Sequence, residues 1–178
     1  MILLFRIISD ENQQFRRDLV IEDSDTFLEM HRILQDNLGY DPSQLASFFI
    51  TSENWEKEQE ITLIDMLQDP GSTSPTMSEA TLGEYFTRPD QRMIYVFDFF
   101  SERAFFMKLI QSSEQTSPRE TPFIADAQGD PPPQLVLDHL MDEDREDPTL
   151  DEEENGSDDP GLDDLDPDLF ENGNPEDY

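Results

Sequence analysis

Two runs rich in apolar residues open the chain, and the apolar positions then change to a helical period. Residues 2–8 and 14–21 are two β-like runs, and the short polar segment between them has the length of a hairpin turn. The next apolar positions recur every three or four residues, at Phe27, Met30, Leu34 and Leu38. This spacing predicts an amphipathic helix after the hairpin.

The ends of this helix are also predicted by residue type. Ser24 or Asp25 is suited to cap its first turn, and Gly39 is suited to end it in a left-handed conformation. A third strand is expected over residues 47–51. The first part of the chain therefore predicts a hairpin, a helix and a strand in that order.

The strongest strand signals lie further along, in residues 92–100 and 103–110. Both segments carry apolar side chains on both faces, as central strands covered on each side do. Two other segments, 62–67 and 81–86, each begin with a threonine three positions before an acid, which is the spacing of a capping box. We predict a short capped helix in each of them.

Together these elements predict an α+β fold. We expect a mixed sheet of about five strands packed on one main helix, with the two short helices as satellites. The opening order of hairpin, helix and strand is reminiscent of a β-grasp arrangement, which is an analogy of fold and carries no function.

Charge divides the chain into two parts. Residues 113–178 carry 23 acidic and two basic side chains, whereas residues 1–112 carry 20 acidic and nine basic ones. A segment with that much self-repulsion and so little apolar surface does not fold alone. We therefore predict a compact domain at 1–112 and a largely disordered acidic arm at 113–178, with short apolar islands at 135–141 and 162–170.

The formal net charge of −32 also restricts the partners. Binding to a phosphate backbone depends on Lys and Arg, so direct nucleic-acid binding is not expected, and basic proteins or cations are more natural partners. The chain has no cysteine, which excludes disulfides and thiolate sites and is compatible with a cytoplasmic location. The first apolar run is interrupted by Arg6 and is far too short to span a membrane, so no membrane association is predicted.

Three short segments occur in a fixed order along residues 1–110: Phe15-Arg16-Arg17, then Met30-His31-Arg32-Ile33-Leu34-Gln35 with Gly39-Tyr40, then Tyr95-Val96-Phe97-Asp98-Phe99. In this order they resemble the Ri-plasmid ORF-three-like family, whose members are also described as transposon-passenger, resolvase-like proteins. The resemblance covers residues 1–110 and leaves the arm outside.

The chain also departs from the family pattern. The family continues after its Asp-Phe pair with a small polar cluster that includes a Trp and a His, and here those positions read Phe100-Ser101-Glu102-Arg103-Ala104-Phe105. Gln44 stands where the family has a further histidine. The resolvase label implies a serine nucleophile in an arginine-rich site, and this acidic domain has no such constellation, so that activity is not carried over.

Asp98 is the main candidate for a buried carboxylate, because it lies within an apolar strand. A buried carboxylate needs a partner, and Arg6, Arg16 or Arg17 of the hairpin could supply it. We predict a structural ion pair between Asp98 and Arg16 or Arg17. No second titratable group accompanies Asp98 at a spacing suited to general acid–base catalysis, so we predict no catalytic residues and no enzyme activity.

The second apolar island is the predicted binding element. Its apolar residues fall on one stripe of a helix, and its ending, Asp168-Leu169-Phe170, has the form of a short docking peptide. The predicted partner-binding residues are Leu162, Leu165, Asp168, Leu169 and Phe170. The alternative is that these are ordinary apolar residues in a solubilising tail.

No cofactor and no defined metal site are predicted. An EF-hand count beginning at Asp142 places Asp147 where the sharp turn needs glycine, so only weak binding of divalent cations is expected. The leading hypothesis is a non-enzymatic binding or adaptor protein that engages a basic macromolecular partner through the arm and the domain. The alternatives are a nucleic-acid mimic that acts on a DNA- or RNA-binding protein, and weak divalent-cation binding by the arm.

Overall fold

The computed structural model describes residues 1–64, 74–115, 117 and 119–135. In chain order the elements are β1 (Ile2–Ser9), β2 (Arg16–Glu22), α1 (Phe27–Leu38), β3 (Ser47–Thr51), β4 (Lys57–Thr62), the one-turn 3₁₀ helix η1 (Leu82–Glu84), β5 (Arg92–Asp98), β6 (Arg103–Ser113) and β7 (Phe123–Gln128). The strands form one seven-stranded sheet in the order β4-β3-β5-β6-β1-β2-β7, and each neighbouring pair is antiparallel.

The predicted fold class was wrong. The architecture is a mostly antiparallel sheet with a single short helix, and it is not a mixed sheet of about five strands packed on a main helix. A β-grasp arrangement would place the first strand parallel to a later central strand, but β1 pairs antiparallel with both of its neighbours, β2 and β6.

Two strands were missed because they lie at the edges of the sheet. The sequence of β4, KEQEIT, is mostly polar, and β7 lies inside the segment that was assigned to the acidic arm. Edge strands carry charged side chains more often than central ones, so neither has the apolar pattern of a central strand. Because β7 pairs with β2, the sheet continues beyond residue 112, where the domain was expected to end.

Helix α1 begins one or two residues later than was predicted. Its N-cap is Thr26, whose hydroxyl accepts from the backbone of Glu29 while the Glu29 carboxylate accepts from the Thr26 backbone, which makes a capping box. Gly39 ends the helix with a φ of 68°, as expected. Of the two predicted short helices, only the single turn η1 is observed; Thr62 ends β4, and 65–67 lie outside the described residues.

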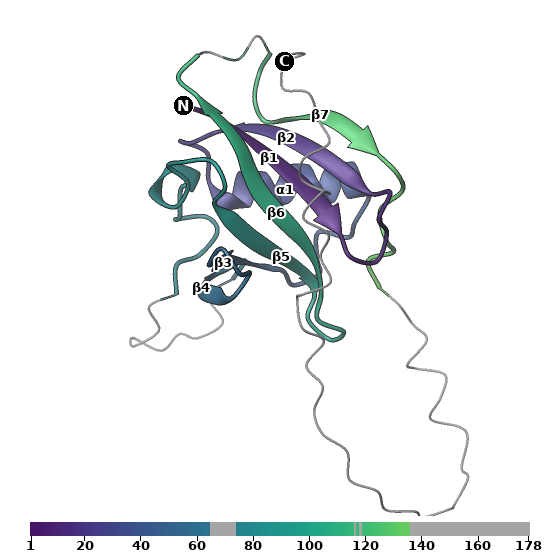
Figure 1. Cartoon of the computed structure of the whole chain (residues 1–178). Helices are drawn as coiled ribbons and strands as arrows, with labels where there is room; N and C mark the ends of the chain where they lie inside the picture. Colours follow the sequence, from purple (N-terminus) through teal and green to yellow (C-terminus); the bar gives the residue numbers. More distant parts are fainter. Residues whose placement is uncertain (65–73, 116, 118, 136–178) are drawn as a thin grey trace, which may run out of the picture.

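The two faces of the sheet are built differently. Figure 1 shows α1 on one face, behind β1 and β6. The large apolar core lies between this helix and the sheet, and it includes Phe5, Phe27, Phe48, Tyr95, Phe97 and Phe105. The opposite face, which we call the open face, carries a smaller cluster of Ile8, Trp55, Ile94, Val96 and Phe106. Neither a helix nor a strand of the described residues packs on the open face.

Candidate functional site

Three polar side chains meet in the core between α1 and the sheet. The side-chain amide of Gln35 donates to the hydroxyl of Tyr95 at 2.6 Å, and Nδ1 of His31 lies 2.8 Å from the same oxygen. All three side chains are buried. Burial, assisted by the charge of Arg32, lowers the pKa of His31 to about 4, so the imidazole is neutral at pH 7. This network fastens α1 to β5 and holds no charge.

Asp98 closes the turn between β5 and β6. Its Oδ1 accepts from the backbone N–H groups of Phe100 and Ser101, at 3.0 and 3.2 Å. Its Oδ2 lies 3.7 Å from Nη1 of Arg103. The carboxylate is buried, and its oxygens therefore serve the local turn and one arginine.

The predicted pairing of Asp98 with the hairpin arginines differs from the observed geometry. Arg16 forms its ion pair with Asp126 of β7. Arg17 donates from Nε to the side chain of Asn37 and from Nη1 to backbone carbonyls. The arginine beside Asp98 is Arg103, the first residue of β6. Arg103 was not predicted, because a partner was expected among the arginines of the β1–β2 hairpin.

Residues 129–135, which we call the tether, follow β7 and are fastened to the domain at several points. The hydroxyl of Tyr40 donates to the carbonyl of Pro132 at 2.6 Å, and burial raises the pKa of Tyr40, which keeps this hydroxyl protonated. The side chain of Gln134 accepts from the backbone of Asp41 at 2.6 Å and donates to its carbonyl at 3.1 Å. Arg103 donates to the carbonyl of Gln134 at 3.3 Å.

The start of the tether needs a glycine. Gly129 has a φ of 64°, and a Cβ there would lie 2.4 Å from the carbonyl oxygen of Gln14. Nη1 of Arg17 donates to the carbonyls of Gln128 and Gly129, at 2.6 and 3.1 Å. Residues that the family resemblance rests on, Arg17 and Tyr40, therefore hold the tether in place.

Exposed apolar side chains lie where the tether ends. Phe99 and Phe100 of the β5–β6 turn are 45% and 83% exposed, and Leu135 is 50% exposed. The bond between Arg103 and Gln134 joins this turn to the tether. We call these three side chains the apolar rim. Large apolar side chains that are exposed to solvent are candidates for an interaction site.

A row of charged residues crosses the open face. Arg92 of β5 lies opposite Lys108 of β6, which lies opposite Arg6 of β1, and Arg6 lies opposite Asp18 of β2. We call Arg6, Arg92 and Lys108 the basic row. The guanidinium of Arg6 contacts the Asp18 carboxylate through two bonds of 2.9 Å, and both residues are buried.

The other two members of the row have partners near the sheet margin. Lys108 pairs with Asp90 at 2.8 Å, and this bond lowers the pKa of the Asp90 carboxyl. Arg92 donates to the carbonyl of Glu53, and its guanidinium lies 5.1 Å from the ring centroid of Trp55. The basic row was missed because each basic residue alone resembles an ordinary strand position. The available signal was one cation in each of three apolar strands, inside β1 and β6 and at the start of β5.

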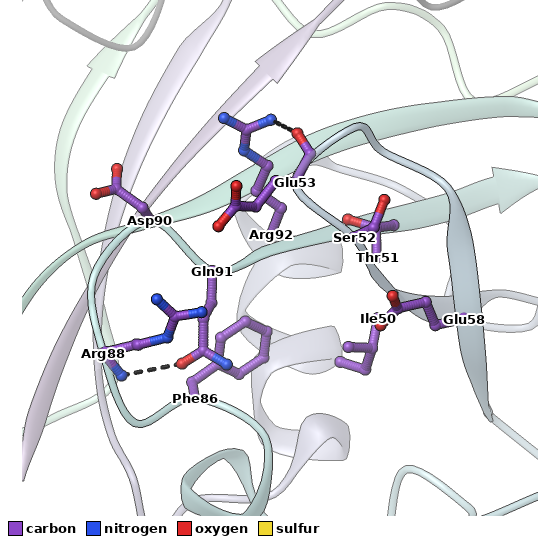
Figure 2. Close-up of a pocket in the computed structure, with 10 residues that line it drawn as sticks. All are labelled: Ile50, Thr51, Ser52, Glu53, Glu58, Phe86, Arg88, Asp90, Gln91 and Arg92. Carbon is purple, nitrogen blue, oxygen red and sulfur yellow. Dashed lines mark hydrogen bonds between the residues drawn. The ribbon is translucent and has the colours of Figure 1, made fainter.

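A pocket of about 320 Å³ opens beside the row, where β3 ends and β5 begins (Figure 2). It is lined by both signs of charge and by hydroxyls, including Thr51, Ser52, Glu53, Arg88, Asp90 and Arg92. The side chain of Gln91 orders the loop at its margin by accepting from the backbone of Thr87 and Arg88. Two buried polar atoms here, Oγ1 of Thr51 and Nε of Arg92, have no hydrogen-bond partner among the described residues.

Metal ligands do not gather in the described part of the chain: no group of three or more His, Asp or Glu side chains suited to an ion is found there. Nor does that part contain a helix long and apolar enough to cross a lipid bilayer. The predicted partner-binding residues Leu162, Leu165, Asp168, Leu169 and Phe170 lie outside the described residues, and of the first apolar island only Leu135 is described.

The fold and these sites define a strand-dominated domain with a fastened C-terminal tether. The chain belongs to the plasmid pRiA4b ORF-3-like protein family, whose model matches residues 4–169. This match confirms the resemblance seen in the sequence and extends it beyond residues 1–110 into the acidic arm.

A solved structure shares the fold. The crystal structure of MM3350, a protein of unknown function from Methanosarcina mazei Go1, aligns with a TM-score of 0.57 at 18% identity, over 71% of this chain and 68% of that chain. The comparison with curated proteins found no match.

Proposed function

We propose that this is a non-catalytic binding protein of the cytoplasm, whose acidic C-terminal segment engages a basic macromolecular partner. Residues 136–178, which we call the acidic tail, carry 19 acidic side chains and one basic one. Such a charge accelerates encounter with a basic surface, and apolar anchors then slow dissociation. The anchors in the tail are Leu162, Leu165, Leu169 and Phe170.

The observation that carries the proposal is the fastening of the tether. Tyr40, Asp41 and Arg103 hold residues 132–134 against the domain, so the acidic tail begins at a defined point beside the apolar rim. A partner bound by the tail is thereby brought to Phe99 and Phe100. A linked second contact of this kind raises the overall affinity through effective concentration.

The polar groups that first suggest chemistry are engaged in supporting the fold. His31 is neutral, buried and bonded to Tyr95, and Asp98 accepts two backbone bonds and faces Arg103. A general base needs access to a substrate proton, and neither group has an open approach. These roles support binding over catalysis.

The test is capture of partners from the native cell by the tagged full chain, followed by titration of the identified partner. We expect the double variant Leu169→Ala/Phe170→Ala to lose at least tenfold in affinity, as removal of central anchors does. The rim variant Phe99→Ser/Phe100→Ser should lose less. Ile64→Ala is its control, because that side chain is 54% exposed elsewhere on the domain.

The main rival is a nucleic-acid mimic, which would bind through charge alone. In that case affinity falls steeply with salt and the anchor variant binds like the parent chain. A partner that is retained equally by the parent and by Leu169→Ala/Phe170→Ala therefore contradicts the docking proposal and favours mimicry.

A further inference from the structure

The open face gathers cations in a chain that has few of them. Of 11 basic residues in the whole chain, three form the basic row on adjacent central strands. Cross-strand neighbours on one face lie close enough for like charges to repel, which costs stability. Such an arrangement persists where anions compensate it.

The carboxylates described on this face compensate the row only in part. Asp18 serves Arg6, and Asp90, which serves Lys108, is 75% exposed and therefore well screened by water. The partners described for Arg92 are a carbonyl and an aromatic ring, and its Nε has no hydrogen-bond partner among the described residues. Among the described contacts, the three cations of the basic row are thus bonded to two carboxylates, Asp18 and Asp90, and Arg92 is the member that is bonded to neither.

Apolar side chains lie directly beside the row. Ile94 of β5 lies opposite Phe106 of β6, which lies opposite Ile8 of β1, one pleat away from the three cations. Ile94 and Phe106 are 4% and 6% exposed, although α1 lies on the other face. Trp55, which meets Phe106 at a ring distance of 5.2 Å, is the covering side chain that the described residues supply.

We propose that the open face is a docking site for the acidic tail of the same chain. The aspartates around 162–170 would face the basic row, and Leu169 and Phe170 would pack against Ile94 and Phe106. The inference rests on the proposed function in one respect, since both use the same tail anchors. It adds regulation: the tail is held on its own domain until a more basic partner displaces it.

The length of the chain allows this contact. The tether ends at Leu135, and 26 residues lie between it and Leu162. An extended chain covers up to about 3.3 Å per residue, so this linker can span about twice the diameter of a domain of this size. Because the tail is attached to its target, its effective concentration is in the millimolar range, and weak contacts suffice.

The chain provides its own optical reporter. Trp55 is the sole tryptophan and lies on the open face, and the absence of cysteine permits a single label. We would replace Asn172→Cys, attach an acceptor dye, and measure energy transfer from Trp55 in the pure full-length protein. Transfer should be high at about 0.01 M salt and fall at about 1 M, as the screening length drops from about 30 to about 3 Å.

Three variants in this labelled chain test the contact. Lys108→Gln should shift the docked-to-free ratio roughly fivefold toward the free state, the upper range for one exposed charge. Leu169→Ala/Phe170→Ala should abolish transfer without touching the folded domain. Arg32→Gln, which removes the same charge from the exposed side of α1, should leave transfer unchanged.

Two results would overturn the inference. Transfer that is equal in the parent and the Leu169→Ala/Phe170→Ala chain means that the tail does not dock through its anchors. Transfer between an unlabelled chain and a labelled Trp55→Phe chain means that a second copy occupies the face. Because this experiment contains no partner, its failure leaves partner capture by the tail standing, and failure of partner capture leaves this docking standing.

Discussion

The two faces of the sheet differ in the kind of side chain that they bury. On the α1 face, aromatic rings pack in a large cluster, and the polar group at its centre is the neutral network of His31, Gln35 and Tyr95. On the open face, a buried ion pair and two further cations interrupt a small apolar cluster. Apolar packing is the cheaper source of stability, since buried charges lose hydration that a partner only partly returns. Stability alone therefore does not explain why the open face carries these charged residues.

The largest effect expected from this contrast separates two neighbouring residues of β6. Phe105 points to the α1 face, where its ring stacks on Phe15 and contacts Phe97, and Phe106 points to the open face. Phe105→Ala should lower the free energy of unfolding by about 3–5 kcal/mol because a cavity remains in the large cluster. Phe106→Ala should cost at least about 1 kcal/mol less. Denaturant titration of both variants checks this, and equal costs would contradict the contrast between the faces.

The next effect concerns the ion pair of the open face. Asp18→Asn keeps the shape of the side chain and removes the charge that Arg6 contacts through two bonds. Loss of one member of a buried pair should cost about 3 kcal/mol of unfolding free energy. The control is Asp90→Asn, which removes an exposed partner of Lys108 and should cost at most about 1 kcal/mol. A similar cost for both variants would mean that the Arg6–Asp18 pair is not effectively buried.

A pH experiment isolates the α1 face. The pKa of His31 is about 4 in the folded chain and near 6.5 in the unfolded chain, so its stabilising contribution is complete above about pH 6.5 and is lost as pH falls toward 4. Between pH 8 and pH 5 the unfolded state takes up a proton that the folded state does not, which lowers stability by about 2 kcal/mol. His31→Gln should lack this part of the pH dependence, so the difference in unfolding free energy between parent and variant should change by about 2 kcal/mol between pH 8 and pH 5, as measured by denaturant titration at each pH. A parallel pair of curves would show that His31 is not buried as a neutral group.

The elements that the sequence predicted correctly are those whose apolar side chains pack into the large core on the α1 face. The spacing of Phe27, Met30 and Leu34 reflects one buried stripe, and Gly39 ends the helix because its left-handed φ favours glycine. The strand over residues 47–51 was predicted with its observed bounds. The strands predicted over 92–100 and 103–110 are observed over 92–98 and 103–113. Local pattern suffices where one face of an element meets a large apolar core.

What the sequence did not predict depends on pairing between distant segments. The register that aligns Arg6, Arg92 and Lys108 is a property of three strands together, and no local pattern reports it. β7 was missed because its neighbours are acidic, although Arg16 pairs with Asp126 once the strands meet. The partner of Asp98 was misassigned to the hairpin, whereas Arg103 lies five residues further along the chain and faces Asp98 across the β5–β6 turn. Charge predicted that the C-terminal third differs from the rest, and only the fold shows where it is attached.

The smallest expected effect concerns the attachment of the tether to the domain. Tyr40→Phe removes one bond, from the Tyr40 hydroxyl to the carbonyl of Pro132, and keeps the ring against Phe97. The cost in global stability should be about 1 kcal/mol, the typical value of one hydrogen bond.

Local opening of the tether should respond more clearly, because the tether has few apolar contacts that could compensate. Amide hydrogen exchange in residues 129–135 should speed up severalfold while β1 and β6 remain protected. Leu45→Ala, a change at a 43% exposed side chain of the same loop, is the control and should leave the exchange of the tether unchanged. If Tyr40→Phe left the tether as protected as in the parent chain, the bonds of Arg17, Arg103 and Gln134 would suffice to hold the point at which the acidic tail begins.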